Sequence, residues 1–378
     1  MRSIFFSNMT QFYSRLLPCA FFALFTFAVF GQSSYPTQFT PHGPGGGGYM
    51  YSPAISPHDP NDIFLVCDMG GQYRSADDGQ RWEMQAAQSL VSTVKGKVQF
   101  TSDPNILYTV RRSTTNLNDP LWRGELAKST DGGASWQAMS DPTDSGVHRL
   151  EVDPGSTQRL IINEYNHLYF SGDGGSSWSM VYQPSDDQMW LGGAFWDGQN
   201  IYVGTNHGLL VSKNGGMSFT VENHNGLPVA TGIYHLVGAK AGATTRLFCI
   251  PAPASEMYAW LEPLSFDGLR QGVFRMNYAA NASWANTRGN IPTEIDMAWV
   301  DLAKTNIQIV WAEGTDAQSF TKTYKSTNGG QSWNGWSRLW NPSTITTRSS
   351  VWGRRCWVIL GRNSRCNGIK LGRWEPRA

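Results

Sequence analysis

Asp68 is the side chain whose type and setting most favour chemistry. It directly follows the apolar segment Ile63–Cys67 and precedes a Met-Gly-Gly sequence whose glycines are Gly70 and Gly71. Glycines beside a carboxylate let a bulky molecule approach it closely. Asp68 is therefore a candidate general base that activates water. An aspartate at the end of a strand also commonly caps a turn, and the sequence leaves both interpretations open.

Glu164 and Glu313 are candidates for a second proton-transfer group. They occupy positions equivalent to Asp68 in later repeats of the chain, and paired carboxylates can act as an acid and a base. The alternative is that both are rim carboxylates that pair with Arg111 or with lysines. Arg111 and His207 stand at equivalent positions in other repeats and are candidate ligand-binding residues.

Five short sequences of the form Ser-x-Asp/Asn-x-Gly-x-x-Trp/Phe divide the chain into repeats. In each, the Asp or Asn side chain is expected to accept backbone N–H bonds in a tight turn, Gly supplies a positive φ, and the aromatic residue begins the next strand. A degenerate copy lies at residues 274–284. The turn residues, with a structural role, are Asp77, Asp131, Asp173, Asn214 and Asn328.

A second pattern precedes these turns: an apolar strand, an Asp-Pro or Asp-Gly turn, and another apolar strand. The turns begin at Asp59, Asp103, Asp153 and Asp197, which are 44 to 50 residues apart. Four strands per unit, repeated at least six times, predict an all-β fold, a β-propeller of six or seven four-stranded blades over residues 49–340. A two-sheet β-sandwich would explain the frequent turns but not the long period.

The first strands of the blades are expected at residues 49–56, 96–102, 147–153, 191–197, 233–238 and 295–301. Antiparallel order then places the turns between second and third strands on the same face as the connections between blades. Asp68, Glu164 and His207 belong to those turns, on the face where a propeller usually binds its ligand.

The residues also carry a family resemblance. The Ser-to-Trp turns look like the Asp-box (BNR) repeats of sialidase-type propellers, over about residues 41–335. Residues 43–82 are more specific: a Gly-rich start leads to a strand and then to Asp68, Gly70, Gly71, Tyr73 and Arg74. This segment resembles the first blade of the xyloglucanase and oligoxyloglucan cellobiohydrolase family.

That resemblance implies a carbohydrate-active protein that hydrolyses a β-glucan-type polysaccharide or oligosaccharide, with Asp68 as the general base. In the family the acid comes from a second propeller that faces the first across a cleft, whereas this chain has room for one. Glu164 and Glu313 could replace that acid if they face Asp68 at about 5 to 9.5 Å.

A sialidase and a non-catalytic propeller are the alternatives to β-glucan hydrolysis. A sialidase would need an arginine cluster and an Arg-Ile-Pro segment near the first blade, and the sequence has neither. A non-catalytic ligand-binding or assembly propeller of the sortilin type needs only a surface, and a protein partner is compatible with it.

Aromatic side chains are further candidates for ligand contact. Tyr49 and Trp190 lie beside expected first strands. Flat rings at a propeller mouth can stack on neutral sugars, and packing between the blades is the alternative. We expect Tyr49, Gly70, Gly71 and Trp190 to contact the substrate.

Composition and motifs exclude several other classes. Thirty Lys and Arg residues against 29 Asp and Glu give a net charge of +1, which argues against nucleic acid as a partner. There is no phosphate loop, metalloprotease motif or EF-hand loop, and the cysteine spacing fits no zinc site. We expect no cofactor and no metal.

Both ends of the chain differ from the repeats. Residues 1–31 look like a cleaved secretory signal with an apolar run at 16–30, which predicts a secreted, extracytoplasmic protein without a membrane span. Residues 32–48 form a Gly/Pro-rich segment. Residues 341–378 carry eight basic residues and one acidic residue, and we interpret this atypical tail as a shifted reading frame or a truncation.

Overall fold

The computed structural model describes residues 50–67, 71–86, 90–91, 96–112, 124–257, 270, 272–304, 306–316 and 321–336, with three short strands further on. Residues 1–41 and 42–378 form separate units, and every described residue belongs to the second. The expected signal, the Gly/Pro-rich segment and most of the basic tail therefore lie outside the described residues.

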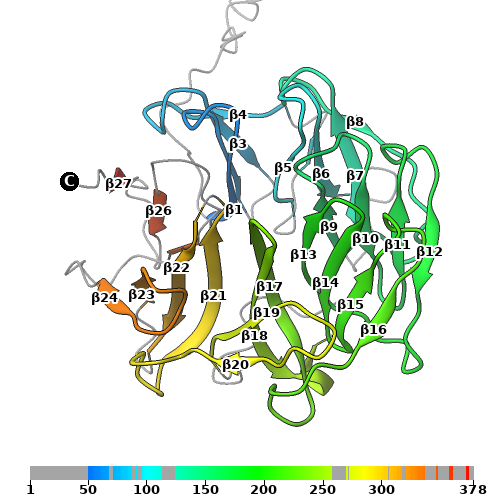
Figure 1. The fold of residues 1–378 in the computed structure, drawn as a ribbon. Helices are drawn as coiled ribbons and strands as arrows, with labels where there is room; N and C mark the ends of the chain where they lie inside the picture. The colour runs from blue at the N-terminus through cyan, green and yellow to red at the C-terminus, as the bar shows by residue number, and fades with distance from the viewer. Residues whose placement is uncertain are drawn as a thin grey trace, which may run out of the picture. The chain divides into compact units, whose positions relative to one another are not determined.

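Six antiparallel sheets of four strands follow one another along the chain and form a β-propeller (Figure 1). This confirms the predicted all-β fold class. Blades 1 to 3 contain β1 (Met50–Ile55), β2 (Ile63–Cys67), β3 (Gln72–Ser75), β4 (Glu83–Met84), β5 (Gln99–Phe100), β6 (Leu107–Arg112), β7 (Gly124–Ser129), β8 (Gln137–Ala138), β9 (Arg149–Val152), β10 (Leu160–Asn163), β11 (Leu168–Ser171) and β12 (Ser179–Tyr182).

Blades 4 to 6 have the same strand order. They contain β13 (Leu191–Asp197), β14 (Asn200–Thr205), β15 (Gly208–Ser212), β16 (Thr220–Glu222), β17 (Thr231–Ala241), β18 (Thr244–Pro253), β19 (Phe274–Asn277), β20 (Ala285–Asn286), β21 (Asp296–Ala303), β22 (Asn306–Thr315), β23 (Thr321–Ser326) and β24 (Asn334–Trp336). A single turn of 3₁₀ helix, η1 (Ala254–Glu256), follows β18. The described residues include no helix of the length and apolarity that a bilayer crossing requires.

The tail differs from its prediction in one respect. The basic composition of residues 341–378 gave no sign of strands, yet β25 (Thr346–Thr347), β26 (Trp357–Leu360) and β27 (Gly372–Arg373) pair in antiparallel order. β25 also contacts β1. Backbone pairing needs no alternating side-chain pattern, which is why the pattern did not reveal these short strands.

The first strand of each blade is the innermost one. First strands of successive blades contact one another, β5 with β9, β9 with β13, β13 with β17 and β17 with β21, and Figure 1 shows β1, β13, β17 and β21 around the centre. The remaining strands follow outward in chain order. Antiparallel order therefore places the turns between second and third strands on one face, which we call the B–C face.

The first strands of blades 2 and 5 depart from their expected lengths. In blade 2, residues 96–102 were expected, but β5 has only two residues. Blade 5 has longer strands than expected. Its first strand was expected at residues 233–238, but β17 runs over 11 residues and β18 over 10. The sequence has no Asp-Pro turn here. Instead, Ala241 pairs with Thr244 across a two-residue turn in which Gly242 has a φ of 57°. This tight turn lets the ladder continue further than in the other blades.

The five predicted Ser-Asp turns have the expected hydrogen bonds. In blade 3, the Ser171 hydroxyl accepts the N–H of Gly175 at 2.8 Å, and Asp173 Oδ1 accepts the N–H of Ser177 at 2.9 Å. Gly175 has a φ of 86°. Blade 5 lacks the motif, and there the N–H of Ala282 bonds to the carbonyl of Ala279.

Candidate functional site

The first predicted site surrounds the B–C turn of blade 1. Asp68, Gly70 and Tyr49 lie outside the described residues, so their roles stay predictions. Gly71 is described: its carbonyl accepts the N–H of Cys67 at 2.7 Å and closes the turn between β2 and β3. A Cβ atom at Gly71 would lie 3.1 Å from the Tyr73 ring, so packing alone favours a glycine at this position.

Glu164 lies in the B–C turn of blade 3 and is fully occupied by hydrogen bonds. Its Oε1 accepts the hydroxyl of Tyr169 at 2.8 Å and bonds His167 Nδ1 at 2.7 Å. Its Oε2 accepts the N–H of Asp144 at 3.0 Å and the hydroxyl of Ser145 at 3.1 Å. The N–H of Ser145 gives a fifth bond at 3.3 Å, and the bonds from Asp144 and Ser145 tie this turn to the connection between blades 2 and 3.

These hydrogen bonds favour the ionised form of Glu164. Burial acts to raise its pKa, but the hydrogen bonds from Tyr169, His167 and the backbone outweigh burial, and the pKa of Glu164 is lowered. A general acid of a glycoside hydrolase needs the opposite, a carboxyl group whose pKa is raised. The surroundings of Glu164 therefore suit a carboxylate that anchors a turn.

Glu313 is placed differently from its prediction. It lies within β22, opposite Trp299 on β21 and Thr323 on β23, and not in the turn after the strand. Its side chain is buried, and the Thr323 hydroxyl lies 3.5 Å from its Oε2. The apolar run that ends near Glu313 continues as a ladder to Thr315, because no turn residue interrupts it.

Arg111 is buried and forms an ion pair within its own blade. Its Nη2 lies 2.9 Å from Glu125 Oε2, and the two residues face each other across β6 and β7. Neither Glu164 nor Glu313 is the ion-pair partner that the sequence suggested for Arg111. A buried pair of this kind holds two strands together.

Trp190 is a core residue, which contradicts the predicted ligand contact. Its side chain is 2% exposed, and its ring stacks on Tyr234 with the centroids 5.4 Å apart. Its Nε1 donates to the carbonyl of Tyr234 at 2.9 Å, and the Arg149 guanidinium lies 4.0 Å from the ring centroid. Trp190 thus packs blade 4 against blade 5, the role expected of a large ring in a wedge between blades.

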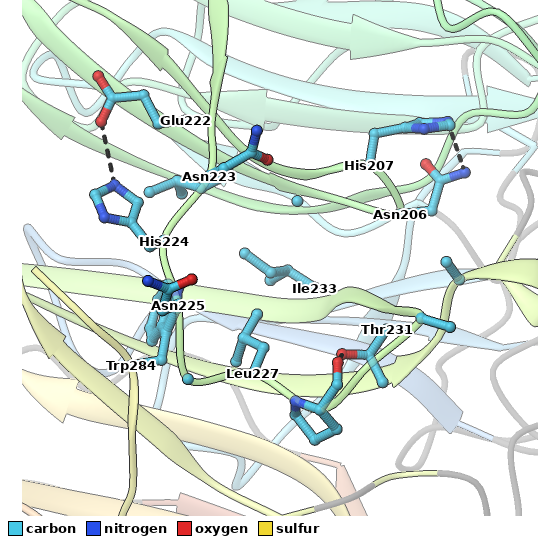
Figure 2. Close-up of a pocket in the computed structure, with 16 residues that line it drawn as sticks. Asn206, His207, Glu222, Asn223, His224, Asn225, Leu227, Thr231, Ile233 and Trp284 are labelled. Atoms are coloured by element: carbon cyan, nitrogen blue, oxygen red, sulfur yellow. Dashed lines mark hydrogen bonds and ion pairs between the residues drawn. The ribbon is translucent and has the colours of Figure 1, made fainter. Parts of the chain in front are cut away.

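His207 lines a pocket of about 360 Å³ between blades 4 and 5, shown in Figure 2. Its Nε2 lies 2.9 Å from the carbonyl of Gln188 and 3.2 Å from Asp186 Oδ1. The polar lining includes Asn206, His207, Glu222, Asn223, His224, Asn225 and Thr231, and the apolar lining includes Leu227, Ile233 and Trp284.

The pocket is built for polar contact without net charge. Asn223 and Asn225 are exposed, and their side chains have no hydrogen-bond partner in the described part of the chain. Glu222 is neutralised by Lys213 at 2.8 Å and accepts the Tyr278 hydroxyl at 2.9 Å. Two free amides beside apolar side chains fit a neutral, hydroxyl-bearing ligand.

The innermost strands carry a second group of ionisable residues, which the sequence analysis did not single out. We call Lys97, Arg149, Glu151, His235 and Lys304 the axial cluster. On β9, Arg149 and Glu151 are half-buried and alternate with buried residues. His235 on β17 also has half-buried exposure between buried neighbours. Lys97 precedes β5 and Lys304 follows β21.

Backbone bonds position the axial cluster across neighbouring blades. His235 Nε2 donates to the carbonyl of Val300 at 2.9 Å, and Lys304 Nζ donates to the carbonyl of Gly238 at 2.8 Å. Both bonds join blade 5 to blade 6. A charged residue at every second position of an inner strand is the sequence signal that could have identified the cluster.

The charges of the axial cluster influence one another. Burial, together with the nearby cations Lys97, Arg149 and Lys304, lowers the pKa of His235 to about 4. Burial also lowers the pKa of Lys304, and Lys97 adds to this effect. Burial raises the pKa of Glu151 against the opposing effect of the three cations. All five side chains therefore share one electrostatic environment near the propeller axis.

Comparison with known proteins gives the class of fold. The structure is similar to the GH74 xyloglucanase from Xanthomonas campestris, with a TM-score of 0.61, 17% identity, and coverage of 84% of this chain and 51% of that enzyme. An ancestral GH74 enzyme gives a TM-score of 0.60 and 17% identity, with 89% and 48% covered. The chain thus spans about half the length of these two enzymes.

The structure is also similar to YCF48 propellers, over nearly the whole length of those chains. YCF48 from Cyanidioschyzon merolae gives a TM-score of 0.57 and 16% identity, with 87% of this chain and 96% of that chain covered. A structure of YCF48 bound to D1 peptide gives 0.56 and 14%, with 87% and 94% covered. At these identities the similarity shows the propeller fold alone. No family model and no curated protein matches the sequence.

Proposed function

We propose that this chain is a carbohydrate-active propeller of the xyloglucanase-like kind, which binds a β-glucan-type polysaccharide on its B–C face and uses Asp68 as a general base. The observation that carries the proposal is the first blade. There the sequence from Asp68 to Arg74 resembles the catalytic segment of that family, and this segment follows the last residue of β2 and includes the start of β3.

The local structure of blade 1 supports this role. All five residues of β2 are buried, so the strand is a rigid base for the turn that contains Asp68. Arg74 is fixed by Asp62, with its Nε 2.7 Å from Asp62 Oδ1. The arginine of the motif therefore stiffens the blade.

Hydrolysis requires a proton donor as well as a base. Five hydrogen bonds lower the pKa of Glu164 and favour its ionised form. Glu313 is buried inside β22. The surroundings of Glu164 and of Glu313 therefore do not favour a general acid. The proposal therefore requires a different acid, either another carboxyl group of this chain or one supplied by another propeller.

The second candidate function is a non-catalytic ligand-binding or assembly propeller. The occupied state of Glu164 and the burial of Glu313 favour it, as does the neutral amide pocket between blades 4 and 5. Similarity to YCF48, whose propeller occurs in a structure with a peptide, extends over nearly the whole of that chain. In this case the ligand would be a polysaccharide that is bound without cleavage, or a protein segment.

The deciding experiment measures reducing-sugar release from xyloglucan and from other β-glucans by the purified protein. We expect release that Asp68→Asn abolishes, while Asp59→Asn, a change at an exposed aspartate of the same blade, leaves it intact. Sialylated glycans serve as the negative substrate. Release that persists in Asp68→Asn would remove Asp68 from the mechanism. Polysaccharide binding without release would favour the second candidate.

The proposal includes secretion, because residues 16–30 form an apolar run of the length found in secretory signals. Expression of the full chain, cell fractionation and determination of the mature N-terminus test this. Full-length protein retained in the cytoplasm would contradict it.

A further inference from the structure

We propose that the pocket between blades 4 and 5 is a carbohydrate-binding site that holds one neutral sugar unit through the side chains of Asn223, Asn225 and His207. The inference rests on the carbohydrate binding proposed above, but it does not depend on Asp68 or on hydrolysis. It starts from the cavity itself. Its volume of about 360 Å³ lies within the range of about 300 to 1,000 Å³ that is usual for small-ligand sites.

The wall of this pocket is fixed before any ligand binds. Residues 223–230, which connect β16 to β17, form much of it. His224 anchors this connection, because its side chain is 2% exposed and its Nδ1 lies 2.9 Å from the carbonyl oxygen of Ala282 in blade 5. The carbonyl of Asn225 accepts the N–H of Trp284, also in blade 5, at 2.8 Å. A wall held in this way loses little conformational entropy when a ligand binds.

The two asparagines that flank His224 present open amides on this wall. His224 is buried, whereas Asn223 and Asn225 are exposed. Neither amide has a hydrogen-bond partner in the part of the chain that the structure describes. Each amide offers two N–H donors and one carbonyl acceptor. A sugar hydroxyl can both donate and accept, so it matches both kinds of group on the same side chain.

His207 supplies a further acceptor. Figure 2 shows it on the side of the pocket away from His224 and Asn225. Its Nε2 lies 2.9 Å from the carbonyl oxygen of Gln188. A carbonyl oxygen only accepts, so Nε2 carries the hydrogen, and Nδ1 is the acceptor of the neutral ring. No described residue donates to Nδ1, so the pocket offers open polar groups on two of its sides.

The charges around the pocket favour a neutral ligand. Glu222 pairs with Lys213 at 2.8 Å, and His207 Nε2 lies 3.2 Å from Asp186 Oδ1. The described lining therefore offers neither an unpaired cation to a carboxylate nor an unpaired carboxylate to an ammonium group. A charged ligand would lose its hydration here without gaining an opposite charge.

A polyol fits this lining better than a peptide side chain does. Ile233 is 0% exposed and Trp284 is 4% exposed, and Leu227 is half-buried. These apolar side chains support the pocket but leave little apolar surface for a ligand to cover. The most exposed lining side chains with hydrogen-bonding groups are the amides of Asn223 and Asn225, which favours a sugar over a protein segment.

Isothermal titration tests the site with three probes: cellotetraose, which is neutral, tetragalacturonic acid, which is anionic, and a chitosan tetramer, which is cationic. The full chain is used with Asp68→Asn, which removes the proposed base, so that hydrolysis does not disturb the measurement. We expect saturable binding of cellotetraose. Binding of each charged tetramer should be at least about tenfold weaker, because no group of the pocket pairs with its charges.

Four further substitutions locate the bound sugar. Asn223→Ala and Asn225→Ala should each weaken cellotetraose binding by about threefold to tenfold, the size of one lost hydrogen bond. Ala254→Trp should abolish binding, because a large side chain at this lining position fills the cavity. Asn281→Ala, at an exposed asparagine outside the pocket lining, is the matched control and should bind normally. Thermal unfolding of each variant verifies that it is folded.

Three results would overturn the proposal. The first is the absence of saturable binding at millimolar cellotetraose, which would leave a protein segment as the ligand to consider for this pocket. The second is binding that Asn223→Ala, Asn225→Ala and Ala254→Trp all leave at full strength, since the sugar would then sit elsewhere. The third is binding of a charged tetramer as tight as that of cellotetraose, which would refute the neutral ligand class.

The outcome of this test is separate from that of the sugar-release experiment. Its readout is binding by a variant that lacks the proposed base. The proposal can therefore fail while the natural protein still releases sugar, and it can hold when no sugar is released.

Discussion

The hydroxyl of Ser171 donates a hydrogen bond of 2.8 Å to the carboxylate of Asp173, and the same oxygen accepts the N–H of Gly175. One serine thus connects the end of a strand to both sides of the following turn. The corresponding Ser-to-Asp or Ser-to-Asn bond measures 2.7 to 2.9 Å in the four other turns of this type. These turns are structural joints that close the outer hairpin of five blades.

Removing that serine should destabilise the propeller. Ser171→Ala leaves the buried N–H of Gly175 without its acceptor, which costs about 1 to 3 kcal/mol. Urea denaturation measures the change in the free energy of unfolding. Ser179→Ala, at an exposed serine on β12, is the control and should have little effect. Equal stability of Ser171→Ala and the control would mean that the turn does not depend on its serine.

The acidic turns should make stability depend on pH at the acid end. Hydrogen bonds, chiefly from Ser135 and Ser177, lower the pKa of Asp131 and of Asp173 to about 2, below the unfolded value of about 3.9. A lowered folded-state pKa stabilises the protein above the unfolded pKa. That contribution is lost as the pH falls from about 4 to about 2.

Asparagine supplies a matched comparison, because Asn214 and Asn328 make the same turn without an ionisable group. We expect the double variant Asp131→Asn, Asp173→Asn to lose less melting temperature than the natural protein over this acid range. Melting temperatures recorded at several pH values test this. Parallel curves for the two proteins would show that these carboxylates do not control acid stability.

Substitution of Trp190 should lower the stability of the protein, because this side chain packs in the core and does not contact a ligand. Replacing a buried Trp by Ala costs about 3 to 5 kcal/mol, and Trp190→Ala also removes the bond to the Tyr234 carbonyl. Trp190→Phe should recover most of the packing but not this bond. Val229→Ala, at a side chain 96% exposed, is the neutral control. A stable Trp190→Ala protein with weakened polysaccharide binding would restore the ligand-contact role predicted from the sequence.

Gly226 shapes the wall of the pocket in Figure 2. Its φ is 102°, and a Cβ atom would lie 2.0 Å from the carbonyl oxygen of Trp284. Gly226→Ala must therefore displace the connection between blades 4 and 5, and we expect it to destabilise the protein by more than about 1 kcal/mol.

Gly242→Ala tests the cost of a positive φ without a steric clash. Gly242 also has a positive φ, 57°, but no atom lies within 4 Å of the added Cβ. Thermal denaturation should rank Gly226→Ala as clearly the less stable of the two. If both variants lost the same stability, the close approach of the added Cβ to the Trp284 carbonyl would not contribute to the free energy of unfolding.

The turn chemistry and the strand period of this protein follow from the sequence by itself. Ser, Asp or Asn, and Gly form the five turns through bonds between residues at most four positions apart, and β2 and β13 have the bounds that their apolar patterns predict. Such interactions are local, so their residue types and spacing determine them. The period of the turns then determined the class of fold, because only a propeller repeats four strands at that length.

The identity of each site residue depends on tertiary structure. Trp190 had the pattern of a surface ring, yet it is covered by Tyr234 and Arg149, which lie 44 and 41 residues away in the chain. Glu164 was a candidate catalytic carboxylate, but five hydrogen bonds from blade 3 and from the connection between blades 2 and 3 lower its pKa. The axial cluster gathers charges from four separate segments. Burial and charge depend on residues that are near in space and distant in sequence, and only the folded ring brings them together.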